Sequence, residues 1–247
     1  MPLYRIGELR AFLKQHGISP RKSLSQNFLV DRNIIEKLIE HVKPGDRVLE
    51  IGPGAGAITE LLRERGAEVF PIEKDERLVA AIGAIPGDIL DYDLDTLPAP
   101  LKVISNLPYQ IASPILTRLV PRRDTFERIT VLVQEEVARR YTASPGSKLY
   151  SSITVFLQFY AEVKWVAKVK RNAFWPVPNV DSAIIDIIPK APPPVDADRF
   201  FAMVRTAFNQ RRKMIRSTLG VDVSARPETL SLNDWLDLFA ALEKQTD

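Results

Sequence analysis

The stretch Val48-Leu49-Glu50-Ile51-Gly52-Pro53-Gly54-Ala55-Gly56 decides the fold of this 247-residue chain. Its mainly apolar first half predicts a buried strand over 47–51. The glycines that follow predict a tight turn into a helix over 56–65, because a residue without a side chain lets the backbone turn sharply and approach a ligand closely. A strand that leads directly into a helix is the unit from which alternating α/β folds are built.

Further strands and helices alternate along the chain on both sides of this glycine loop. Alternation of this kind predicts a mostly parallel, doubly wound sheet of the α/β class. Strands are expected at 68–72, near Gly87, and at 102–105, 128–134, 162–170 and 182–188. Helices are expected at 5–15, after an N-cap at Asp31, and at 75–82, 111–119, 135–142 and 149–160.

A proline-rich segment separates two regions of different pattern. Pro189-Lys190-Ala191-Pro192-Pro193-Pro194 is stiff and extended by its composition. Beyond it the apolar spacing is wholly helical, and Ser231-Leu232-Asn233-Asp234 indicates a capping box at the start of the last helix. We therefore expect an α/β domain over 1–189, a linker over 190–194 and a small all-α domain over 195–247.

Composition limits the classes of function. Hydrophobic residues make up 45% of the chain and charged residues 26%, which is the balance of an ordinary soluble globular protein. The lack of cysteine excludes disulfides, thiolate metal sites and a cysteine nucleophile. His16 and His41 each fall on a predicted helix without a second ligand nearby, so no metal site is expected. Without a signal peptide or a long apolar stretch, we expect a cytoplasmic protein with no membrane contact, and we expect it to be a monomer.

Basic residues gather in clusters, although the formal net charge is only +3. The segment from 205 to 216 holds five basic residues and no acidic one, and smaller clusters lie at 164–171 and 10–22. Separated clusters favour a face that contacts phosphates, while a solvated helix face is the common alternative. The members of the first cluster are Arg205, Arg211, Arg212, Lys213 and Arg216.

The glycine loop and two later acidic residues indicate an adenosine-containing cofactor. Glu73 ends the next strand, where a carboxylate can accept hydrogen bonds from both ribose hydroxyls. Asp88 closes the third strand, where a carboxylate can bind an adenine amine. A dinucleotide site requires G-x-G-x-x-G, whereas residues 52–56 have G-x-G-x-G. The spacing therefore favours S-adenosylmethionine over a nicotinamide dinucleotide.

The tetrapeptide Asn106-Leu107-Pro108-Tyr109 directly follows the strand at 102–105. Proline cannot donate to a sheet, so the tetrapeptide is expected to form a fixed arch at the carboxyl end of the strand, where open α/β sheets bind ligands. An amide oxygen and a carbonyl can hold the two hydrogens of an exocyclic amine, and a ring can stack on a heterocycle. On the tetrapeptide alone, a loop in which Pro108 only ends the strand and Tyr109 packs inward is an equal alternative.

A series of short sequence blocks extends across nearly the whole chain. The blocks are Gln26–Leu29, Glu50–Gly56, Glu73, Gly87–Asp88, Asn106–Tyr109, Gln134–Ala138, Pro145–Lys148, Phe174–Ser182 and Phe208–Lys213. In kind and order they resemble the ribosomal RNA adenine N6-dimethyltransferase family of the KsgA (RsmA) type, which modifies small-subunit rRNA. Leu107 favours this rRNA branch, because related DNA amino-methyltransferases typically have proline at that place.

The resemblance implies a Rossmann-like class I methyltransferase domain that uses S-adenosylmethionine, releases S-adenosylhomocysteine, and dimethylates two adjacent adenosines of 16S rRNA within a 30S subunit or its precursor. It implies that Asn106 and the Leu107 carbonyl bind the target N6 amine while the base lies between two rings. The catalytic residues that it implies are Asn106, Leu107, Pro108, Tyr109 and Phe174. Its cofactor-binding residues are Gln26, Asn27, Leu29, Glu50, Gly52, Gly54, Glu73, Lys74, Asp88, Ile89 and Asn106. Its RNA-binding residues are Arg205, Arg211, Arg212, Lys213 and Arg216.

Two other functions stay open. One is a 23S rRNA adenine dimethylase of the macrolide-resistance type, which Leu107 and the basic segment at 208–213 disfavour. The other is a non-catalytic ribosome-assembly or transcription factor that reuses the fold. The chain also departs from the family pattern, because only 14 residues separate Glu73 from Asp88, where a longer helix and a fuller third strand are usual, and Asn179 stands where lysine is common. Glu135 and Glu136 begin a helix, so they suit the helix dipole as well as a functional role.

Overall fold

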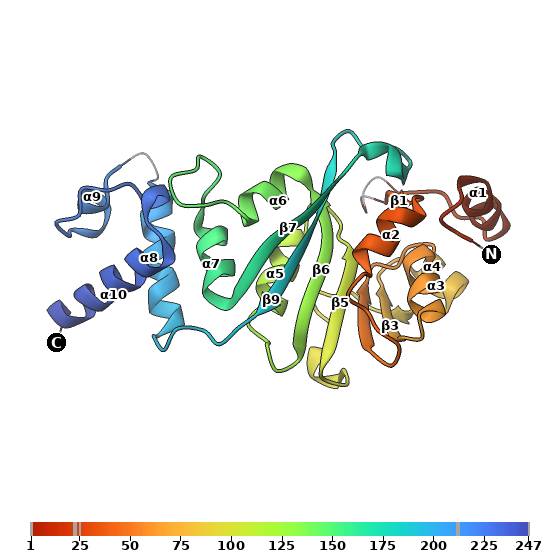
Figure 1. Ribbon diagram of the computed structural model, residues 1–247, viewed down its shortest axis with the longest axis horizontal. Coiled ribbons are helices and arrows are strands. Elements are labelled where there is room, and N and C mark those ends of the chain that lie inside the picture. The colour runs from red at the N-terminus through yellow and green to blue at the C-terminus, as the bar shows by residue number, and fades with distance from the viewer. Residues whose placement is uncertain (1, 22–23, 25, 211–212, 247) are drawn as a thin grey trace. The chain divides into compact units, whose positions relative to one another are not determined.

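The computed structural model describes residues 2–21, 24, 26–210 and 213–246 (Figure 1). The chain divides into two compact units. The first, which we call the sheet unit, consists of Met1–Ala138 and Lys164–Pro189. The second, which we call the helical unit, consists of Arg139–Val163 and Lys190–Asp247.

A sheet of seven strands is found within the described residues. Its strands are β2 (Arg47–Ile51), β3 (Glu68–Glu73), β4 (Ile85–Pro86), β5 (Leu101–Asn106), β6 (Phe126–Gln134), β7 (Ala161–Val169) and β9 (Ser182–Pro189). They lie in the order β4-β3-β2-β5-β6-β9-β7. Neighbours from β4 to β6 are parallel, and β9 is antiparallel to β6. The predicted α/β class with a mostly parallel sheet is confirmed.

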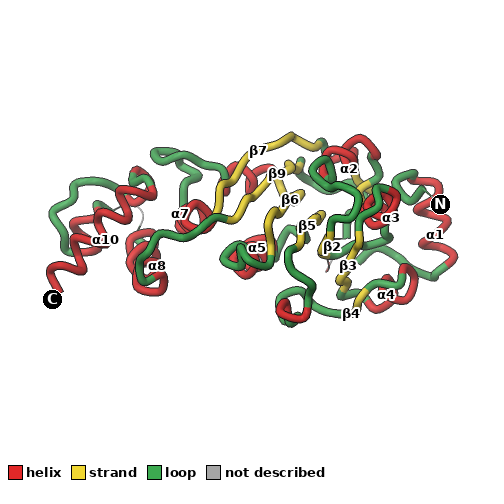
Figure 2. The backbone as a smooth tube through the Cα atoms, turned by 60° about the horizontal axis from the view of Figure 1, so that its bottom comes forward, coloured by secondary structure: helices red, strands yellow, loops and turns green. Residues whose placement is uncertain are grey.

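Helices flank this sheet and build the helical unit. They are α1 (Ile6–Gln15), α2 (Arg32–Leu38), α3 (Ala57–Glu64), α4 (Glu76–Ile82), α5 (Ala112–Leu119), α6 (Glu135–Tyr141), α7 (Ser152–Tyr160), α8 (Ala197–Asn209), α9 (Ile215–Leu219) and α10 (Leu232–Thr246). Figure 2 shows α2, α3 and α4 on one side of the strands and α5 on the other. The predicted doubly wound arrangement is therefore present.

Two predicted helix starts are confirmed by their hydrogen bonds. The Asp31 carboxylate accepts from the backbone N–H groups of Asn33 and Ile34, at 2.9 and 3.3 Å. At the start of α10, Ser231 N–H donates to the Asp234 carboxylate at 2.8 Å, and Asp234 N–H donates to the Ser231 hydroxyl at 3.2 Å. These side chains satisfy backbone donors that the first turn of a helix leaves without partners.

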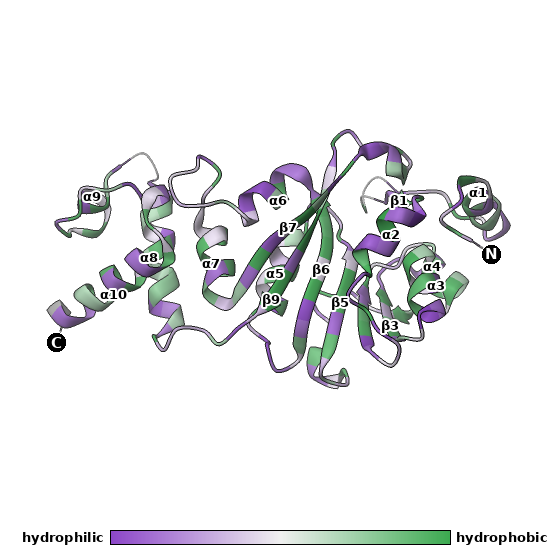
Figure 3. Ribbon diagram, in the orientation of Figure 1, coloured by the Kyte–Doolittle hydropathy of each residue, from purple (hydrophilic) through white to green (hydrophobic). Residues whose placement is uncertain are grey.

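The central strands are buried on both faces. Val103 and Ile104 of β5, although they point to opposite faces, are 0% and 2% exposed. Val131 and Leu132 of β6 are both 0% exposed. Figure 3 shows these two strands coloured mainly as hydrophobic. Continuous apolar runs are typical of parallel strands that helices cover on both sides.

The boundary predicted from the proline-rich segment needs a correction. Lys190 does begin the last part of the helical unit, but Arg139–Val163 also belongs to this unit rather than to the domain predicted over 1–189. The reason is packing: Phe159 of α7 lies in one buried cluster with Phe200 of α8 and Trp235 of α10. The ring centroids of Phe159 and Phe200 are 5.1 Å apart. A contact between residues this distant in sequence leaves no local signal.

The third strand is short, as the close spacing of Glu73 and Asp88 predicts. Helix α4 has seven residues and ends at Gly83, whose φ of 66° is one that glycine adopts readily. Strand β4 has two residues, which pair with Ile72 and Glu73 of β3. Asp88 nevertheless follows β4 by only two residues, so it still lies at the carboxyl edge of the sheet.

Candidate active site

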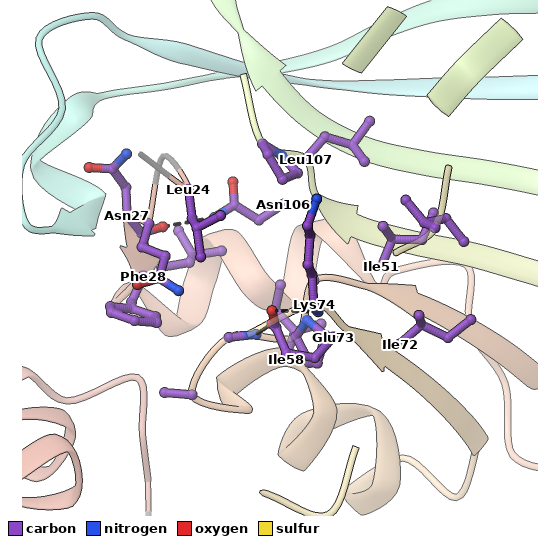
Figure 4. Close-up of a pocket in the computed structure, with 18 of the residues that line it drawn as sticks. Leu24, Asn27, Phe28, Ile51, Ile58, Ile72, Glu73, Lys74, Asn106 and Leu107 are labelled. Carbon is purple, nitrogen blue, oxygen red and sulfur yellow. Dashed lines mark hydrogen bonds between the residues drawn. The ribbon is translucent and has the colours of Figure 1, made fainter. Parts of the chain in front are cut away.

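A pocket of about 230 Å³ lies at the carboxyl ends of β2, β3 and β5, within the sheet unit. Figure 4 shows its lining at close range. The pocket brings together all but two of the predicted catalytic and cofactor-binding residues. Those that line it are Gln26, Asn27, Leu29, Gly52, Gly54, Glu73, Lys74, Asp88, Ile89, Asn106, Leu107, Pro108 and Tyr109.

The glycine loop forms one wall of this pocket through its backbone. Gly52, Gly54 and Gly56 have φ values of 64°, 60° and 94°, which L-residues with side chains rarely adopt. A Cβ atom on Gly54 would lie 3.1 Å from the ring of Phe28, so a side chain there would also crowd the wall. Glycine is therefore required at this place for both backbone conformation and space.

Glu73 joins the glycine loop to the end of β3. Its Oε2 accepts from Gly54 N–H at 3.0 Å, and its Oε1 accepts from the N–H groups of Lys74 and Asp75, each at 2.9 Å. The residue is only 7% exposed. Burial raises the pKa of its carboxyl, and the three N–H groups oppose that rise. A carboxylate has about four acceptor positions, so one remains at Oε2 for a ligand hydroxyl.

Lys74 and Asp88 form an ion pair in the lining of the pocket. The Lys74 Nζ lies 2.6 Å from Asp88 Oδ2, and Leu90 N–H donates to Asp88 Oδ1 at 3.0 Å. The hydrogen bond from Lys74 lowers the pKa of the Asp88 carboxyl. Asp88 is therefore charged at neutral pH and acts only as a hydrogen-bond acceptor.

Asn106 is oriented by the segment that faces it across the pocket. Its Nδ2 donates to the Asn27 carbonyl at 2.9 Å, drawn as a dashed line in Figure 4. This bond commits the donor end of the amide and leaves Oδ1 as the acceptor end. The peptide group between Asn106 and Leu107 is also held in place, because Leu107 N–H donates to the Leu132 carbonyl of β6 at 3.0 Å. The Leu107 residue is 1% exposed. The arch expected at the end of β5 is present.

Tyr109 closes the arch with a tethered ring. Its hydroxyl lies 3.0 Å from the hydroxyl of Ser182, the first residue of β9. Burial raises the pKa of the Tyr109 hydroxyl. The ring is half-buried and lines the pocket. The sequence left two alternatives, a ring available to a ligand and a ring packed inward. Tyr109 combines them, because its hydroxyl is bonded inward while its ring contributes to the cavity wall.

Asp75 and Arg77 hold the segment that carries Gln26, a role that no motif in the sequence indicates. Arg77 donates to both carboxylate oxygens of Asp75, at 2.9 and 2.5 Å, and Gln26 Nε2 donates to Asp75 Oδ2 at 2.9 Å. The hydrogen bonds from Arg77 lower the pKa of the Asp75 carboxyl to about 2. The sequence offers one signal for Asp75, namely an aspartate directly before a predicted helix. Asp75 is indeed the N-cap of α4, and its side chain accepts a hydrogen bond from Arg77 N–H.

Comparison with known proteins identifies the family. A family model described as ribosomal RNA adenine dimethylase matches residues 17–237. The chain belongs to the ribosomal RNA adenine dimethylase family. Among its relatives, a protein of Protochlamydia amoebophila named ribosomal RNA small subunit methyltransferase A is 45% identical over 98% of this chain and 98% of the relative. The protein of that name from Chlamydia muridarum is 40% identical over 96% of this chain and 98% of the relative.

Solved structures share the fold of this family member. A dimethyladenosine transferase from Plasmodium falciparum has a TM-score of 0.79 at 24% identity, covering 87% of this chain and 97% of the other. The 23S rRNA methyltransferase ErmE has a TM-score of 0.70 at 30% identity, covering 88% and 100%. The predicted Rossmann-like class I methyltransferase fold and the predicted family are confirmed. The alignment with the P. amoebophila relative spans 278 positions, so that relative has residues that this chain lacks.

Glu50 does not contribute to the pocket lining, so its cofactor-binding role stays a prediction. The strand alternation of β2 turns its side chain towards α3, where Thr59 Oγ1 donates to Glu50 Oε2 at 2.6 Å. Glu50 is 0% exposed, and its Oε1 has no partner among the described residues. Burial raises the pKa of its carboxyl to about 8. Glu50 is therefore a protonated residue behind the glycine loop.

Phe174 also lies outside the lining, so its grip on the target base stays a prediction. Its strand β8 (Phe174–Trp175) pairs with β1 (Phe28–Leu29), with Phe174 opposite Leu29. This pairing directs Phe174 into the core of the sheet unit, where it is 1% exposed and clusters with Leu29 and Ile104. Of the two predicted rings, only that of Tyr109 borders the pocket.

The basic cluster predicted to contact RNA lies in the helical unit. Arg205, Lys213 and Arg216 are exposed, whereas Arg211 and Arg212 fall outside the described residues. The part of the chain that the structure describes contains no group of three or more histidine, aspartate or glutamate side chains placed to hold a metal ion. In the same part, no helix is both long and apolar enough to cross a membrane.

Proposed function

We propose that this family member uses S-adenosylmethionine to place two methyl groups on the N6 amine of each of two adjacent adenosines of 16S rRNA, within a 30S subunit or its precursor. The observation that carries the proposal is that the glycine loop, Glu73, Asn106 and Tyr109 line one pocket. A methyl donor and a planar aromatic amine can therefore meet in one cavity, in an arrangement that favours reaction between them.

The residues of the pocket fit this cofactor. The side-chain-free wall at Gly52 and Gly54 admits close approach, and Glu73 retains acceptor capacity for a ribose hydroxyl. Asp88, kept charged by Lys74, can accept from an adenine amine, and the neighbouring apolar side chain of Ile89 suits the face of the ring. The cofactor, when bound, supplies an electrophilic methyl group on its sulfonium.

Asn106 and the Leu107 carbonyl would orient the target amine. Adenine N6 is a poor nucleophile because its lone pair is delocalised into the purine. Two acceptors that hold its hydrogens favour a pyramidal nitrogen whose lone pair is directed at the methyl group. The commitment of Asn106 Nδ2 to the Asn27 carbonyl supports this role, since Oδ1 is then the atom left to accept. Neither histidine borders the pocket, so the proposed mechanism depends on orientation rather than on a strong base.

Tyr109 would hold the target base after it leaves its stack. Removing a base from a helix costs a few kcal/mol, and stacking on an aromatic side chain offsets roughly 1–3 kcal/mol of this. Because Phe174 is buried in the core, the proposal places the stacking contact on Tyr109.

The choice of small-subunit rRNA rests on the relatives. The relatives that are 45% and 40% identical carry the small-subunit name, whereas the 23S enzyme ErmE is 30% identical. The exposed Arg205, Lys213 and Arg216 would contribute phosphate contacts, which add affinity without selecting a base.

Transfer of a tritiated methyl group tests the proposal. The substrates are 30S subunits that lack these methyl groups, 50S subunits and naked 16S rRNA. We expect label in 30S subunits, on adenines identified as N6,N6-dimethyladenosine after digestion. Label in 50S subunits alone would contradict the proposal and favour the 23S enzyme. No label in any of the three, with cofactor binding intact, would favour an assembly factor that reuses the fold.

A further inference from the structure

The last residue of the sequence block Phe174–Ser182 lies behind the pocket wall and bonds to Tyr109. Phe174 is buried in the core, whereas Ser182 bonds to Tyr109, which borders the pocket. Ser182 is 0% exposed and stands opposite Gln134, the last residue of β6. The only oxygen of its side chain is thus presented at the edge of the sheet where the pocket lies.

The bond between the hydroxyls of Tyr109 and Ser182 holds the far end of the Tyr109 ring. Tyr109 follows Pro108 in the turn before α5, so its backbone is not held in a strand or helix. A tyrosine side chain rotates about two bonds. A hydrogen bond at the phenolic oxygen fixes the rotation about Cα–Cβ, and with it the place of the ring, whereas the oxygen itself lies on the axis of the rotation about Cβ–Cγ. At 3.0 Å the distance between the two hydroxyl oxygens is that of a formed hydrogen bond.

Ser182 is itself held by a set of ionic contacts around the preceding residue. Asp181 Oδ1 accepts from Arg171 N–H at 3.0 Å, and its Oδ2 lies 3.1 Å from Lys168 Nζ. The backbone carbonyl of Asp181 accepts from Glu135 N–H at 3.0 Å, and Lys168 Nζ also lies 2.8 Å from the Glu135 carboxylate. These contacts join the ends of β6, β7 and β9, so the start of β9 is fixed from three directions.

We propose that Ser182 is a positioning residue that holds the Tyr109 ring at the place required to stack on the target adenine. The inference rests on the proposed function, because it concerns the step in which the base is held for transfer. Ser182 does not touch the base or the cofactor; it acts through Tyr109. The ionic set at Asp181 keeps the serine in place while the arch accepts and releases its substrate.

A double-mutant cycle tests this role. Tyr109→Phe and Ser182→Ala remove the same hydrogen bond from its two ends. We expect each to lower kcat for methyl transfer to 30S subunits by roughly 3- to 10-fold, with cofactor Kd unchanged. The double variant should equal Tyr109→Phe alone, because the second change then removes nothing further. Multiplying effects would overturn the inference, as would a Tyr109→Phe variant with the kcat of the unchanged protein.

Thr130→Val is the matched control. Thr130 Oγ1 donates to Asp186 Oδ1 at 2.9 Å, so it is a buried hydroxyl that joins the same two strands, β6 and β9, at a place away from the arch. Any effect of this control should multiply with that of Tyr109→Phe. If Ser182→Ala does not fold, Tyr109→Phe still decides the outcome, since it leaves β9 unchanged. If the unchanged protein does not methylate 30S subunits, the proposed function fails; if it does and the cycle is multiplicative, only this inference fails.

Discussion

The carboxyl edge of the sheet and the helical unit are stabilised in opposite ways. At the sheet edge, charged and amide groups such as Glu73, Asp75 and Asn106 each make hydrogen bonds of fixed direction. The helical unit instead has a cluster of rings around Phe200 and Trp235. Directional bonds position a ligand to within a fraction of an ångström, whereas apolar packing supplies stability with little regard to direction. A substitution at the edge should therefore change binding or transfer, and one in the ring cluster should change stability.

The largest effect is expected from Trp235→Ala, which breaks the packed side of the comparison. Trp235 is 0% exposed, and its ring centroid lies 5.8 Å from that of Phe208. The substitution should lower the free energy of unfolding by about 3–5 kcal/mol, measured by urea denaturation. Trp235→Phe should cost much less, because the Nε1–H that it removes has no partner among the described residues. An equal loss of cofactor affinity in the folded Trp235→Ala variant would contradict the separation of roles.

Asn106→Ala should break the directional side. Loss of its Oδ1 removes one of the two proposed acceptors for the amine, so methyl transfer should fall about 100-fold or more. Cofactor binding should stay measurable by calorimetry, because Glu73 and the glycine loop are unchanged. Asn33→Ala, at an exposed position in α2, is the matched control and should keep full activity. Near-normal turnover of Asn106→Ala would refute the orientation mechanism.

Glu73→Gln sharpens the comparison within the sheet edge. Glu73 now accepts hydrogen bonds from three N–H groups, and the amide NH2 of glutamine would face at least one of these donors. The substitution would also weaken the acceptor that we propose for the ribose hydroxyl. We expect cofactor Kd to rise about 10- to 100-fold by calorimetry, a cost of the size of one or two lost charged hydrogen bonds. Glu64→Gln, exposed on α3, should leave Kd unchanged. An unchanged Kd in Glu73→Gln would remove Glu73 from the cofactor site.

Charge on the helical unit should add affinity by neutralising phosphates, without selecting a base. Replacing Arg205, Lys213 and Arg216 by glutamine should weaken rRNA binding on all sequences alike, and the slope of log Kd against log salt should fall by about 1 for each phosphate that is no longer neutralised. Filter binding across a range of salt concentrations measures the slope. An unchanged slope would show that these side chains do not bind phosphates. The unfolding free energy should stay the same, since all three are exposed.

The last prediction concerns Glu50, whose effect on stability depends on pH. The folded protein retains the Glu50 proton up to about pH 8, whereas the unfolded chain releases it near pH 4.5. The contribution of Glu50 to stability is therefore full below pH 4.5 and declines as the pH rises towards 8. Glu50→Gln keeps the bond from Thr59 and removes this decline, so its melting temperature relative to the unchanged protein should be higher at pH 8 than at pH 5. A difference that does not change with pH would contradict the burial of a protonated carboxyl.

Local patterns predicted the fold and most of the residues that line the pocket. The glycine loop, the N-cap at Asp31 and the arch from Asn106 to Tyr109 each depend on a few adjacent residues, and the structure contains all three. The two predicted catalytic or cofactor-binding residues that lie outside the pocket lining are ones whose direction depends on packing with other elements. Phe174 faces the core because β8 pairs with β1, about 145 residues earlier in the chain. Glu50 faces α3 because of its place in the strand alternation, which the motif containing it does not reveal.

The shortness of β4 has a consequence for the behaviour of the protein at high concentration. A sheet edge with free backbone groups can pair with another chain and start aggregation. Here the edge strand β4 has only two residues, Ile85 and Pro86, which pair with the last two residues of β3. The part of β3 that β4 does not cover, residues 68–71, ends in Pro71. Proline has no N–H to donate, so each interrupts the row of donors that an incoming strand would need. The short segment between Glu73 and Asp88, which makes β4 only two residues long, thus also protects this edge of the sheet against self-association.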